Sequence, residues 1–469
     1  MTSVQNEKLL DFLESLNITK NQVCEDELTS TVTYVVKACH VPPLQNPNVP
    51  YTASDFESVA NNAEIQLSVI LRILDRIYSA KKGGQKFSPV FTRNVVVSCF
   101  LVACEYIDEN WEWGSKKTAN TSESVMNKLC EVCNCRSVQT FLTHTSTDTA
   151  GRSSTENDMN AVEKEKEVFY LKYILQRLSE MLNKNNWKIY PALKMSYVWI
   201  LHNIRREHVE EHLVYLLPPA LFIVDDWEQQ NKVLGLKCLH YILEITTGSE
   251  LRWYGRAAVI YNALKPILHS REAEVLEVLY PAIIKVAVVL DSDPSNTGQL
   301  KNENIRDVIL QQLLRDMRYE QNLALRCVYA NELPRVLAAM GIFAIRWSQD
   351  LMDVCTDYIA TYDGATASSR ISILRALQVY VQECWPQVHI DASSMMQMVV
   401  RLLYDVTDED SDYSPQTLHN VTQEAGILIS FLHSAVPKTC QELCQGLGDI
   451  PVHPQCQLLL KKIFSPLMN

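Results

Sequence analysis

Apolar residues recur along most of the chain at the three- and four-residue spacing that marks one face of an α-helix. The clearest single stripe consists of Val168, Leu171, Leu175, Leu178 and Leu182, at intervals of 3, 4, 3 and 4 residues. Residues 9–16 and 65–77 repeat the pattern, and residues 95–107 are almost entirely apolar. The pattern predicts a chain built mainly from helices.

Residues 274–290 show the inverse arrangement, because nearly every position is apolar and the exceptions are few. The exceptions are Glu274, Glu277, Pro281 and Lys285, at intervals of 3, 4 and 4 residues. The β-branched residues of this stretch favour a strand by propensity, but the spacing places all the exceptions on one helical face. We predict a helix covered by other helices on most of its circumference, with a kink at Pro281.

A helix–turn–helix pattern recurs five times in the second half of the chain. The segments are 217–243, 264–290, 313–337, 351–385 and 398–432, with turns at 225–226, 270–272, 318–320, 362–364 and 405–412. The second helices, near Val233, Val275, Leu323 and Ile371, are roughly 40–50 residues apart, the period of HEAT and armadillo repeats. Such units bury their apolar faces against their neighbours. We predict an all-α fold, an α-solenoid of HEAT/armadillo-like helical repeats.

The same pattern of apolar and polar residues divides the chain into three regions. Residues 1–142 form an N-terminal helical region, in which the proline-rich stretch 41–50 should be extended. Residues 143–160 are polar and rich in Ser and Thr, so they bury too little apolar surface to offset their ordering entropy. We predict that this stretch is a disordered insertion and that residues 161–469 form the HEAT-like repeats.

Composition narrows the class of function. Glycine accounts for 13 of 469 residues, which disfavours β-sandwiches and glycine-rich nucleotide-binding folds. The formal net charge of −12 argues against nucleic acid as the main ligand. Neither a signal-peptide pattern nor about 18 consecutive apolar residues occurs, so we expect no membrane association. We expect the 14 cysteines to be reduced and mostly buried, and the location to be cytoplasmic and nuclear.

One five-residue pattern raises the possibility of an enzyme. Residues 208–212 (HVEEH) match the HxxEH pattern of inverted zinc proteases, in which His208 and His212 would share a metal beside the base Glu211. The sequence offers no identifiable third ligand, and the helix should end at Pro218. We interpret the pattern as a solvated helix face and predict no catalytic residues.

Two further patterns suggest metal ligands. Cys130, Cys133 and Cys135 include a CxxC pair, half of a common zinc site, but a second CxxC is absent and buried thiols are the better interpretation. The acidic stretch 405–412 resembles half of a calcium loop. Counted from Asp408, however, its sixth residue is Tyr413 where glycine is required. We predict neither a metal nor a cofactor.

Four segments of the repeat region carry a family resemblance. They are 225–240 (DDWEQQNKVLGLKCLH), 256–264 (RAAVIYNAL), 326–341 (RCVYANELPRVLAAMG) and 401–405 (RLLYD). Over residues 217–404 the chain resembles the Tel-two-interacting protein two family, whereas its N-terminal part shows no match. The resemblance implies an α-solenoid subunit of the TTT co-chaperone complex.

In that complex the family member pairs directly with the first Tel-two-interacting protein and, through it, with Tel-two. With the ninety-kilodalton heat-shock chaperone, the assembly supports the folding and abundance of phosphatidylinositol-kinase-related kinases, and hence DNA-damage and nutrient signalling. From these segments and the unit junctions we select eight candidate partner-binding residues. They are Asp225, Asp226, Trp227, Trp253, Arg256, Arg326, Trp347 and Asp405.

The tryptophans Trp227, Trp253, Trp347 and Trp385 fall at or near unit junctions. We expect most of them to pack between helices and one or two to be exposed anchors. The favoured function is a non-enzymatic scaffold whose carboxyl-terminal repeats bind the partner, so truncation after Asn296 should abolish binding. An unrelated HEAT adaptor for transport or a phosphatase is the alternative.

Overall fold

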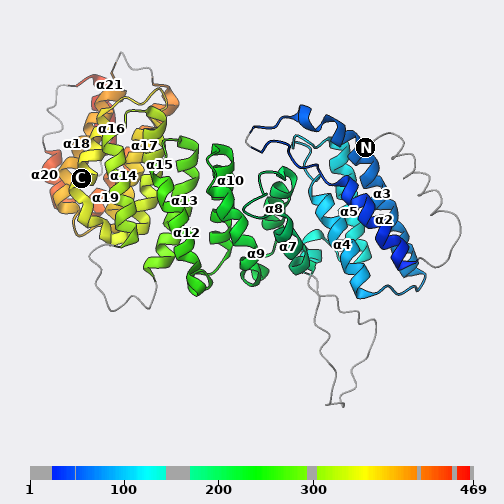
Figure 1. Cartoon of the computed structure of the whole chain (residues 1–469). Coiled ribbons are helices and arrows are strands. Elements are labelled where there is room, and N and C mark those ends of the chain that lie inside the picture. Colours follow the sequence, from blue (N-terminus) through cyan, green and yellow to red (C-terminus); the bar gives the residue numbers. More distant parts are fainter. Residues whose placement is uncertain are drawn as a thin grey trace, which may run out of the picture. The chain divides into compact units, whose positions relative to one another are not determined.

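The computed structural model describes residues 24–47, 49–143, 170–292, 304–408, 413–445 and 452–464. Within these ranges the chain consists of helices and their connections, without a β-strand (Figure 1). The predicted all-α fold is therefore confirmed. The predicted insertion lies outside the described residues except for Thr143, and so does the predicted helix at 9–16. The helices form two compact units that divide between Ile223 and Val224.

The described residues of the N-terminal unit form nine helical elements. They are α2 (Glu25–Cys39), η1 (Ala53–Phe56), α3 (Glu57–Lys82), α4 (Pro89–Cys104), α5 (Lys116–Val132), α6 (Val138–Thr143), α7 (Tyr170–Met181), α8 (Pro191–Asn203) and most of α9 (Arg206–Val224). The apolar stretch predicted at 95–107 forms most of α4, which packs against α2, α5, α7 and α8. Ser88 caps this helix by accepting a hydrogen bond from the Phe91 amide.

The proline pair of α9 contradicts our expectation that the helix ends at Pro218. α9 continues through Pro218 and Pro219 to Val224. A proline inside a helix removes an amide donor and costs about 3 kcal/mol in isolation. Here Leu216 and Ala220 on either side of the prolines are fully buried, and the Tyr197 hydroxyl donates a hydrogen bond of 2.7 Å to the Leu216 carbonyl. Tertiary packing therefore outweighs the local preference.

The C-terminal unit begins with the last residue of α9 and contains fifteen further elements in its described residues. They are α10 (Gln229–Ile245), α11 (Gly248–Arg252), η2 (Trp253–Gly255), α12 (Arg256–Leu264), η3 (Lys265–His269), α13 (Ala273–Asp291), α14 (Ile305–Tyr319), α15 (Leu323–Met340), η5 (Gly341–Trp347), α16 (Ser348–Ala360), α17 (Ser368–Glu383), α18 (Val388–Val406), α19 (Pro415–Ala435), α20 (Pro437–Cys444) and α21 (Pro454–Phe464). In their described residues the predicted turns fall at or within two residues of connections between these helices, and residues 409–412 of the last turn lie outside the described residues.

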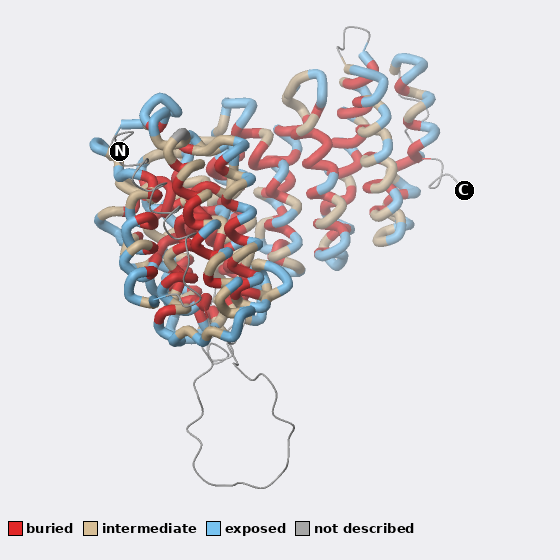
Figure 2. The backbone as a smooth tube through the Cα atoms, turned by 90° about the vertical axis from the view of Figure 1, so that its right-hand side faces the viewer, coloured by how far each residue is buried: buried red, intermediate tan, exposed pale blue. Residues whose placement is uncertain are grey.

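The helices of the C-terminal unit stack in two layers. The second helices of successive repeats, α10, α13, α15, α17 and α19, each pack against the next, and the first helices α14, α16 and α18 do the same in the other layer. Buried residues follow the facing sides of the helices, and exposed residues cluster at their ends (Figure 2). This is the predicted α-solenoid of HEAT-like repeats.

Helix α13 confirms that residues 274–290 form a helix covered by other helices, while the kink at Pro281 stays a prediction. Its residues Val275, Leu279, Ile283 and Val286 are fully buried, because α10, α12, α14 and α15 all contact this helix. The helix runs without interruption through Pro281.

One described segment, Leu323–Ala360, is long and apolar enough for a membrane span by length and composition, although the sequence had suggested none. It consists of α15, η5 and α16, and the chain changes direction at Gly341, where φ is +58°. Half of its most apolar window is buried, since α15 packs between α13 and α17 and α16 packs between α14 and α18. The segment is apolar because it forms the centre of the stack.

Candidate functional site

The eight candidate partner-binding residues separate onto two opposite edges of the C-terminal unit. One edge, here called the turn edge, carries the turns within the repeats, described at 225–228, 270–272, 320–322, 361–367, 407–408 and 413–414. The other, here called the junction edge, carries the connections between repeats, including 246–255, 341–347 and 384–387. Asp225, Asp226, Trp227, Arg326 and Asp405 lie at the turn edge. Trp253, Arg256 and Trp347 lie at the junction edge.

Asp226 is buried at the turn edge, next to the exposed Asp225. One carboxylate oxygen accepts a hydrogen bond of 2.8 Å from the Trp227 amide, and the other accepts one of 2.7 Å from Nδ2 of Asn231 in the first turn of α10. The carboxylate therefore holds a side chain of α10.

Arg326 begins a second, longer-range set of contacts at the turn edge. Its side chain is buried, and Nη1 donates 3.1 Å to the Glu320 carbonyl in the turn before its own helix, α15. Nη2 donates 3.1 Å to Asp357 on α16, a helix of the next repeat, and the guanidinium lies 3.8 Å from the centre of the Tyr358 ring. This one side chain therefore joins two successive repeats.

Arg370 makes the equivalent set of contacts one repeat later. Its side chain is only 2% exposed, and Nε donates 3.0 Å to the Thr361 carbonyl in the turn before α17. Nη1 donates 2.9 Å to the Tyr413 hydroxyl and Nη2 donates 3.3 Å to Asp405 on α18. Burial raises the pKa of Asp405, and the charge of Arg370 opposes that rise.

We call Arg326 and Arg370, with the acids and carbonyls they bind, the arginine rungs. Arg326 and Asp405 are among the candidate residues predicted from the sequence, whereas Arg370 and Asp357 are not. The signal that could have identified them is an arginine in the first turn of each of two second helices, followed 31 or 35 residues later by an aspartate. The rungs give Arg326 and Asp405 a role in holding the stack together, while their role in partner binding stays a prediction.

The junction edge exposes aromatic side chains. Trp253 is 62% and Tyr254 is 82% exposed, in the short helix η2 that leads into α12. Arg256 forms an ion pair with Glu250, and its guanidinium lies 5.3 Å from the centre of the Tyr254 ring. The charge of Arg256 thus fixes an aromatic ring at the surface.

Trp347 is half-buried at the same edge, where its indole Nε1 donates 2.9 Å to Asp307 in the first turn of α14. It lines a recess of about 280 Å³ together with Leu314, Arg318 and Tyr319. Since Asp307 is almost fully buried, the indole is held in one orientation against the first-helix layer.

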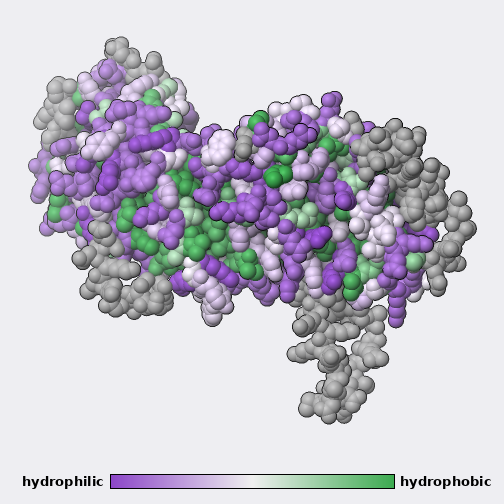
Figure 3. Space-filling model, in the orientation of Figure 1, coloured by the Kyte–Doolittle hydropathy of each residue, from purple (hydrophilic) through white to green (hydrophobic). Residues whose placement is uncertain are grey.

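The tryptophans at the unit junctions differ from our expectation that most would pack between helices. Trp227, Trp253 and Trp385 are each more than 60% exposed, and Trp347 alone of the four is half-buried. The connections of a solenoid lie at its edges, where no neighbouring repeat covers them. Figure 3 shows that further apolar side chains reach the visible surface of this unit, around α12 and α13, among hydrophilic residues.

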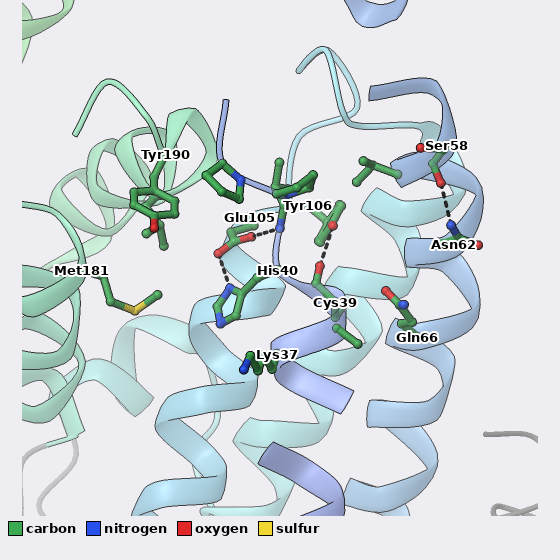
Figure 4. A pocket seen from close by; sticks show the side chains of 16 residues that line it. Lys37, Cys39, His40, Ser58, Asn62, Gln66, Glu105, Tyr106, Met181 and Tyr190 are labelled. Atoms are coloured by element: carbon green, nitrogen blue, oxygen red, sulfur yellow. Dashed lines mark hydrogen bonds and ion pairs between the residues drawn. The ribbon is translucent and has the colours of Figure 1, made fainter. Parts of the chain in front are cut away.

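The N-terminal unit contains a cavity of about 630 Å³, shown in Figure 4. Ser58, Asn62 and Gln66 of α3 lie on one side of it, and Met181 and Tyr190 lie across from them. The centre carries the end of α2 and the end of α4.

The ionisable groups of this cavity hold the chain itself. Glu105, 1% exposed, accepts 2.6 Å from His40 and 2.8 Å from the Val41 amide, while the Tyr106 hydroxyl donates 2.6 Å to the Cys39 carbonyl. Burial disfavours the charged form of His40, but the charge of Glu105 and the hydrogen bond to it outweigh burial, so the pKa of His40 is raised. The pair anchors the predicted extended stretch, which has no regular secondary structure in its described residues.

The protease-like pattern does not form a metal site. Among the described residues, no three His, Cys, Asp or Glu side chains are grouped so that they could hold a metal ion. Val209 and Leu213 are buried, His212 is buried as well, and burial lowers the pKa of His212. The expectation of a fully solvated histidine face is therefore wrong for His212.

Cys130, Cys133 and Cys135, which are all described, are likewise not grouped so that they could hold a metal ion. Burial raises the pKa of Cys130 and Cys133 to about 11 and that of Cys135 to about 12, so these thiols stay protonated at neutral pH. All fourteen cysteines are free and most are buried, as predicted. In the calcium-like stretch, Tyr413 binds Arg370, and residues 409–412 lie outside the described residues.

The comparison with known families decides the identity of the chain. A model described as the Tti2 family matches residues 100–367, more than half of the sequence. The chain belongs to the Tti2 family. In this Tti2-family chain the match starts within α4 and ends just before α17, so it includes part of the N-terminal unit that the resemblance over residues 217–404 left out.

Curated relatives carry a consistent name. The protein named TELO2-interacting protein 2 from Homo sapiens is 29% identical over 319 residues, which cover 67% of this chain and 58% of that protein. Its namesake from Rattus norvegicus is 29% identical over 314 residues, with the same two coverages. The Tti2-family chain thus matches 58% of the length of these relatives.

Solved structures show the same fold at low sequence identity. Yeast importin-beta (Kap95p) has a TM-score of 0.50 and 12% identity, covering 93% of this chain and 46% of that one. A structure of Kap95p with RanGDP gives a TM-score of 0.50 and 12% identity, covering 86% and 45%. At such identities the likeness establishes the helical-repeat fold of the Tti2-family chain and nothing about its partners.

Proposed function

We propose that this chain is a non-enzymatic scaffold subunit of the TTT co-chaperone complex. It binds the first Tel-two-interacting protein directly and shares the complex with Tel-two. With the ninety-kilodalton heat-shock chaperone, this complex supports the maturation and stability of phosphatidylinositol-kinase-related kinases, in the cytoplasm and the nucleus. The observation that carries the proposal is the match to the Tti2 family over residues 100–367.

The distribution of polar and apolar groups supports a binding role. His40 and Glu105 of the N-terminal cavity and the arginine rungs are engaged in contacts that hold the helices together. The exposed aromatic residues, by contrast, lie at the edges of the repeats, as expected for anchors of a protein partner. The relatives' printed name, TELO2-interacting protein 2, points to the same class of partner.

The experiment is affinity purification of the full tagged chain from cells, followed by mass spectrometry. We expect the first Tel-two-interacting protein and Tel-two in near-stoichiometric amounts, with the kinases as weaker associates. Depletion of the chain should lower the steady-state abundance of those kinases. Recovery of transport factors or of a phosphatase in their place would establish the alternative HEAT adaptor and overturn the proposal.

A truncation after Asn296 locates the interface within the chain. It removes α14 and every later helix, and so also the two neighbours, α14 and α15, that cover part of α13. We expect loss of the partner, with circular dichroism of the purified fragment showing whether the remaining helices persist. Undiminished binding would place the interface in the N-terminal part.

A further inference from the structure

The described wall of the N-terminal cavity contains one carboxylate, and both oxygens of this group are engaged. One oxygen of Glu105 accepts 2.6 Å from Nδ1 of His40, and the other accepts 2.8 Å from the Val41 amide. Lys37 and His40 are the two basic side chains among the described residues that line the cavity. The wall therefore offers a ligand positive charge, while its acidic group already has its donors.

Three polar groups of this wall have no partner among the described residues. They are Nε2 of His40, Nζ of Lys37 and the hydroxyl of Tyr190. Lys37 lies three residues before His40 at the end of α2, and Tyr190, the residue before α8, lies across the cavity from His40 (Figure 4). The three groups thus reach the cavity from two sides.

The protonation state of His40 decides whether its remaining nitrogen donates. Because Nδ1 is bound to Glu105, Nε2 carries a hydrogen only when the whole ring is protonated. The charge of Glu105 and the hydrogen bond to it raise the pKa of His40 against the opposing effects of burial and of Arg177 on α7. Arg177 is itself paired with Glu180 at 3.2 Å. The protonated ring, which Glu105 favours, supplies an N–H donor whose orientation Glu105 fixes.

The rest of the wall is largely apolar and sets the kind of ligand. The volume of about 630 Å³ lies within the ~300–1,000 Å³ that is usual for ligand sites. The apolar lining residues are Val41, Pro42, Pro43, Val59, Met181 and Leu193. Two basic side chains in such surroundings suit a single negative charge on an apolar group better than a phosphate dianion, which needs more donors.

We propose that the N-terminal cavity binds a carboxylate attached to an apolar group, with the carboxylate held by His40, Lys37 and Tyr190. A free monocarboxylic acid and the C-terminal carboxylate of a polypeptide share this chemistry. The site goes beyond the proposed function, because it involves neither the repeats of the C-terminal unit nor the first Tel-two-interacting protein.

The first test compares hexanoate, hexanol and hexylamine, which differ only in the polar group, by isothermal titration calorimetry with the full chain. We expect hexanoate to bind at least about tenfold more tightly than hexanol, because the carboxylate gains charge-assisted hydrogen bonds, and hexylamine to bind most weakly. Equal affinities for the three probes would overturn the proposal, because the cavity would then be selecting only the apolar group. Absence of hexanoate binding at about 10 mM would overturn it as well, unless the peptide acid described next binds.

A peptide pair distinguishes the two sources of the carboxylate. Acetyl-Ala-Leu-Leu is titrated with a free C-terminal carboxylate and, separately, as the C-terminal amide. Tighter binding of the peptide acid than of hexanoate would identify a polypeptide C-terminus as the ligand, and the reverse order would identify a free acid. We expect the amide to bind at least about tenfold more weakly than the peptide acid. Equal affinities of the acid and the amide would overturn the proposal.

Variants of the full chain locate the carboxylate within the cavity. Tyr190→Phe and Lys37→Met each remove one donor and retain the apolar part of the side chain. Lys86→Met is the control, since Lys86 is an exposed lysine beyond the opposite end of α3. We expect each cavity variant to weaken hexanoate binding about threefold to tenfold and the control to stay within about twofold, with circular dichroism confirming that all three fold. Unchanged affinity in both cavity variants would overturn the assignment of these donors.

The pH dependence of hexanoate binding tests His40 without a substitution. Affinity should decline as the pH rises from 6 to 9 through the raised pKa of His40, because Nε2 changes from a donor to an acceptor. The charged groups that face His40 are Glu105, Arg177 and Lys37, of types that ordinarily do not titrate in this range, and burial raises the pKa of Cys39 and of Tyr106 well above it. An affinity that is constant or rises with pH would overturn the role of His40. Each of these failures would leave the proposed function intact, since no probe involves the protein partner.

Discussion

Gly235 and Gly426 offer a paired test of how closely the helices of the C-terminal unit pack. Both lie inside helices, Gly235 in α10 and Gly426 in α19. A Cβ at position 235 would lie 2.4 Å from the backbone nitrogen of Val224 and 2.6 Å from its Cα, whereas a Cβ at 426 would meet nothing within 4 Å. The same substitution to alanine should therefore have opposite effects.

The magnitudes follow from two competing terms. Alanine is favoured over glycine inside a helix by about 0.8–1.0 kcal/mol, so Gly426→Ala should raise the free energy of unfolding by about 1 kcal/mol. At 235 the added methyl group meets backbone, which has to move by about 1 Å, and overpacking of this kind costs about 1–3 kcal/mol. When the backbone moves away by about 1 Å, the fully buried Leu236 and Leu239 on the same helix also lose up to half of their dispersion energy. We expect Gly235→Ala to lower the free energy of unfolding by about 2 kcal/mol.

The assay is differential scanning calorimetry of the full chain. Both positions belong to the unit Val224–Asn469, so both variants should shift the same transition. For a unit of this size about 1 kcal/mol corresponds to about 2–4 °C, so Gly235→Ala should lower Tm by about 4–8 °C and Gly426→Ala should raise it by about 2–4 °C. If Gly235→Ala stabilises as much as Gly426→Ala does, the close approach of α10 to Val224 is wrong.

Three further predictions concern the arginine rungs, the His40–Glu105 pair and the packing of α10. Arg370→Met should lower the free energy of unfolding by about 1–3 kcal/mol in urea, because it strips the half-buried Asp405 carboxylate and the Thr361 carbonyl of their donor. Arg375→Met, at a 57% exposed side chain on the same helix, should cost less than about 1 kcal/mol, and equal costs would refute the rung. The wild type should be more stable than His40→Gln, and this difference should be largest below about pH 6.5. It should decline as the pH rises through the raised pKa of His40, as measured by denaturation between pH 6 and 9. A difference in stability that grows with pH would contradict the ion pair. Leu236→Ala should cost about 2–5 kcal/mol and Asp226→Ala about 1–3 kcal/mol, the latter by removing one of the two carboxylates, Asp226 and Glu228, that accept from the buried Asn231 amide; negligible effects of both on thermal melting would refute the repeat register.

Helix periodicity was sufficient to predict the repeats, because each helix of a solenoid buries one face against neighbours whose positions repeat. The polar exceptions Glu274, Glu277, Pro281 and Lys285 correctly identified α13 as a covered helix despite its β-branched residues. The turns at 270–272 and 362–364 were placed within the observed connections for the same reason. These features depend on local spacing, which the sequence contains in full.

The misjudged features depend on contacts that are remote in sequence. The continuation of α9 through Pro218 is decided by the burial of its flanking residues, and proline chemistry alone points the other way. The exposure of Trp227 and Trp385 depends on which repeat ends have no neighbour, which composition does not reveal. The pairing of Arg370 with Asp405 across 35 residues becomes visible only once the repeats are in register. The eight candidate partner-binding residues could be selected from the sequence. Their separation onto two opposite edges of the unit could not be predicted from it.

The arginine rungs have a consequence for how the C-terminal unit would respond to mechanical tension. Each rung connects one repeat only to the next one. The rungs therefore do not link distant repeats, and a pulling force does not have to break them all together. The stack should yield repeat by repeat, each step releasing the ~44 residues between Arg326 and Arg370, or about 150 Å of extended chain. A scaffold of this construction can lose a terminal repeat under load while the remaining repeats keep their fold and their surfaces.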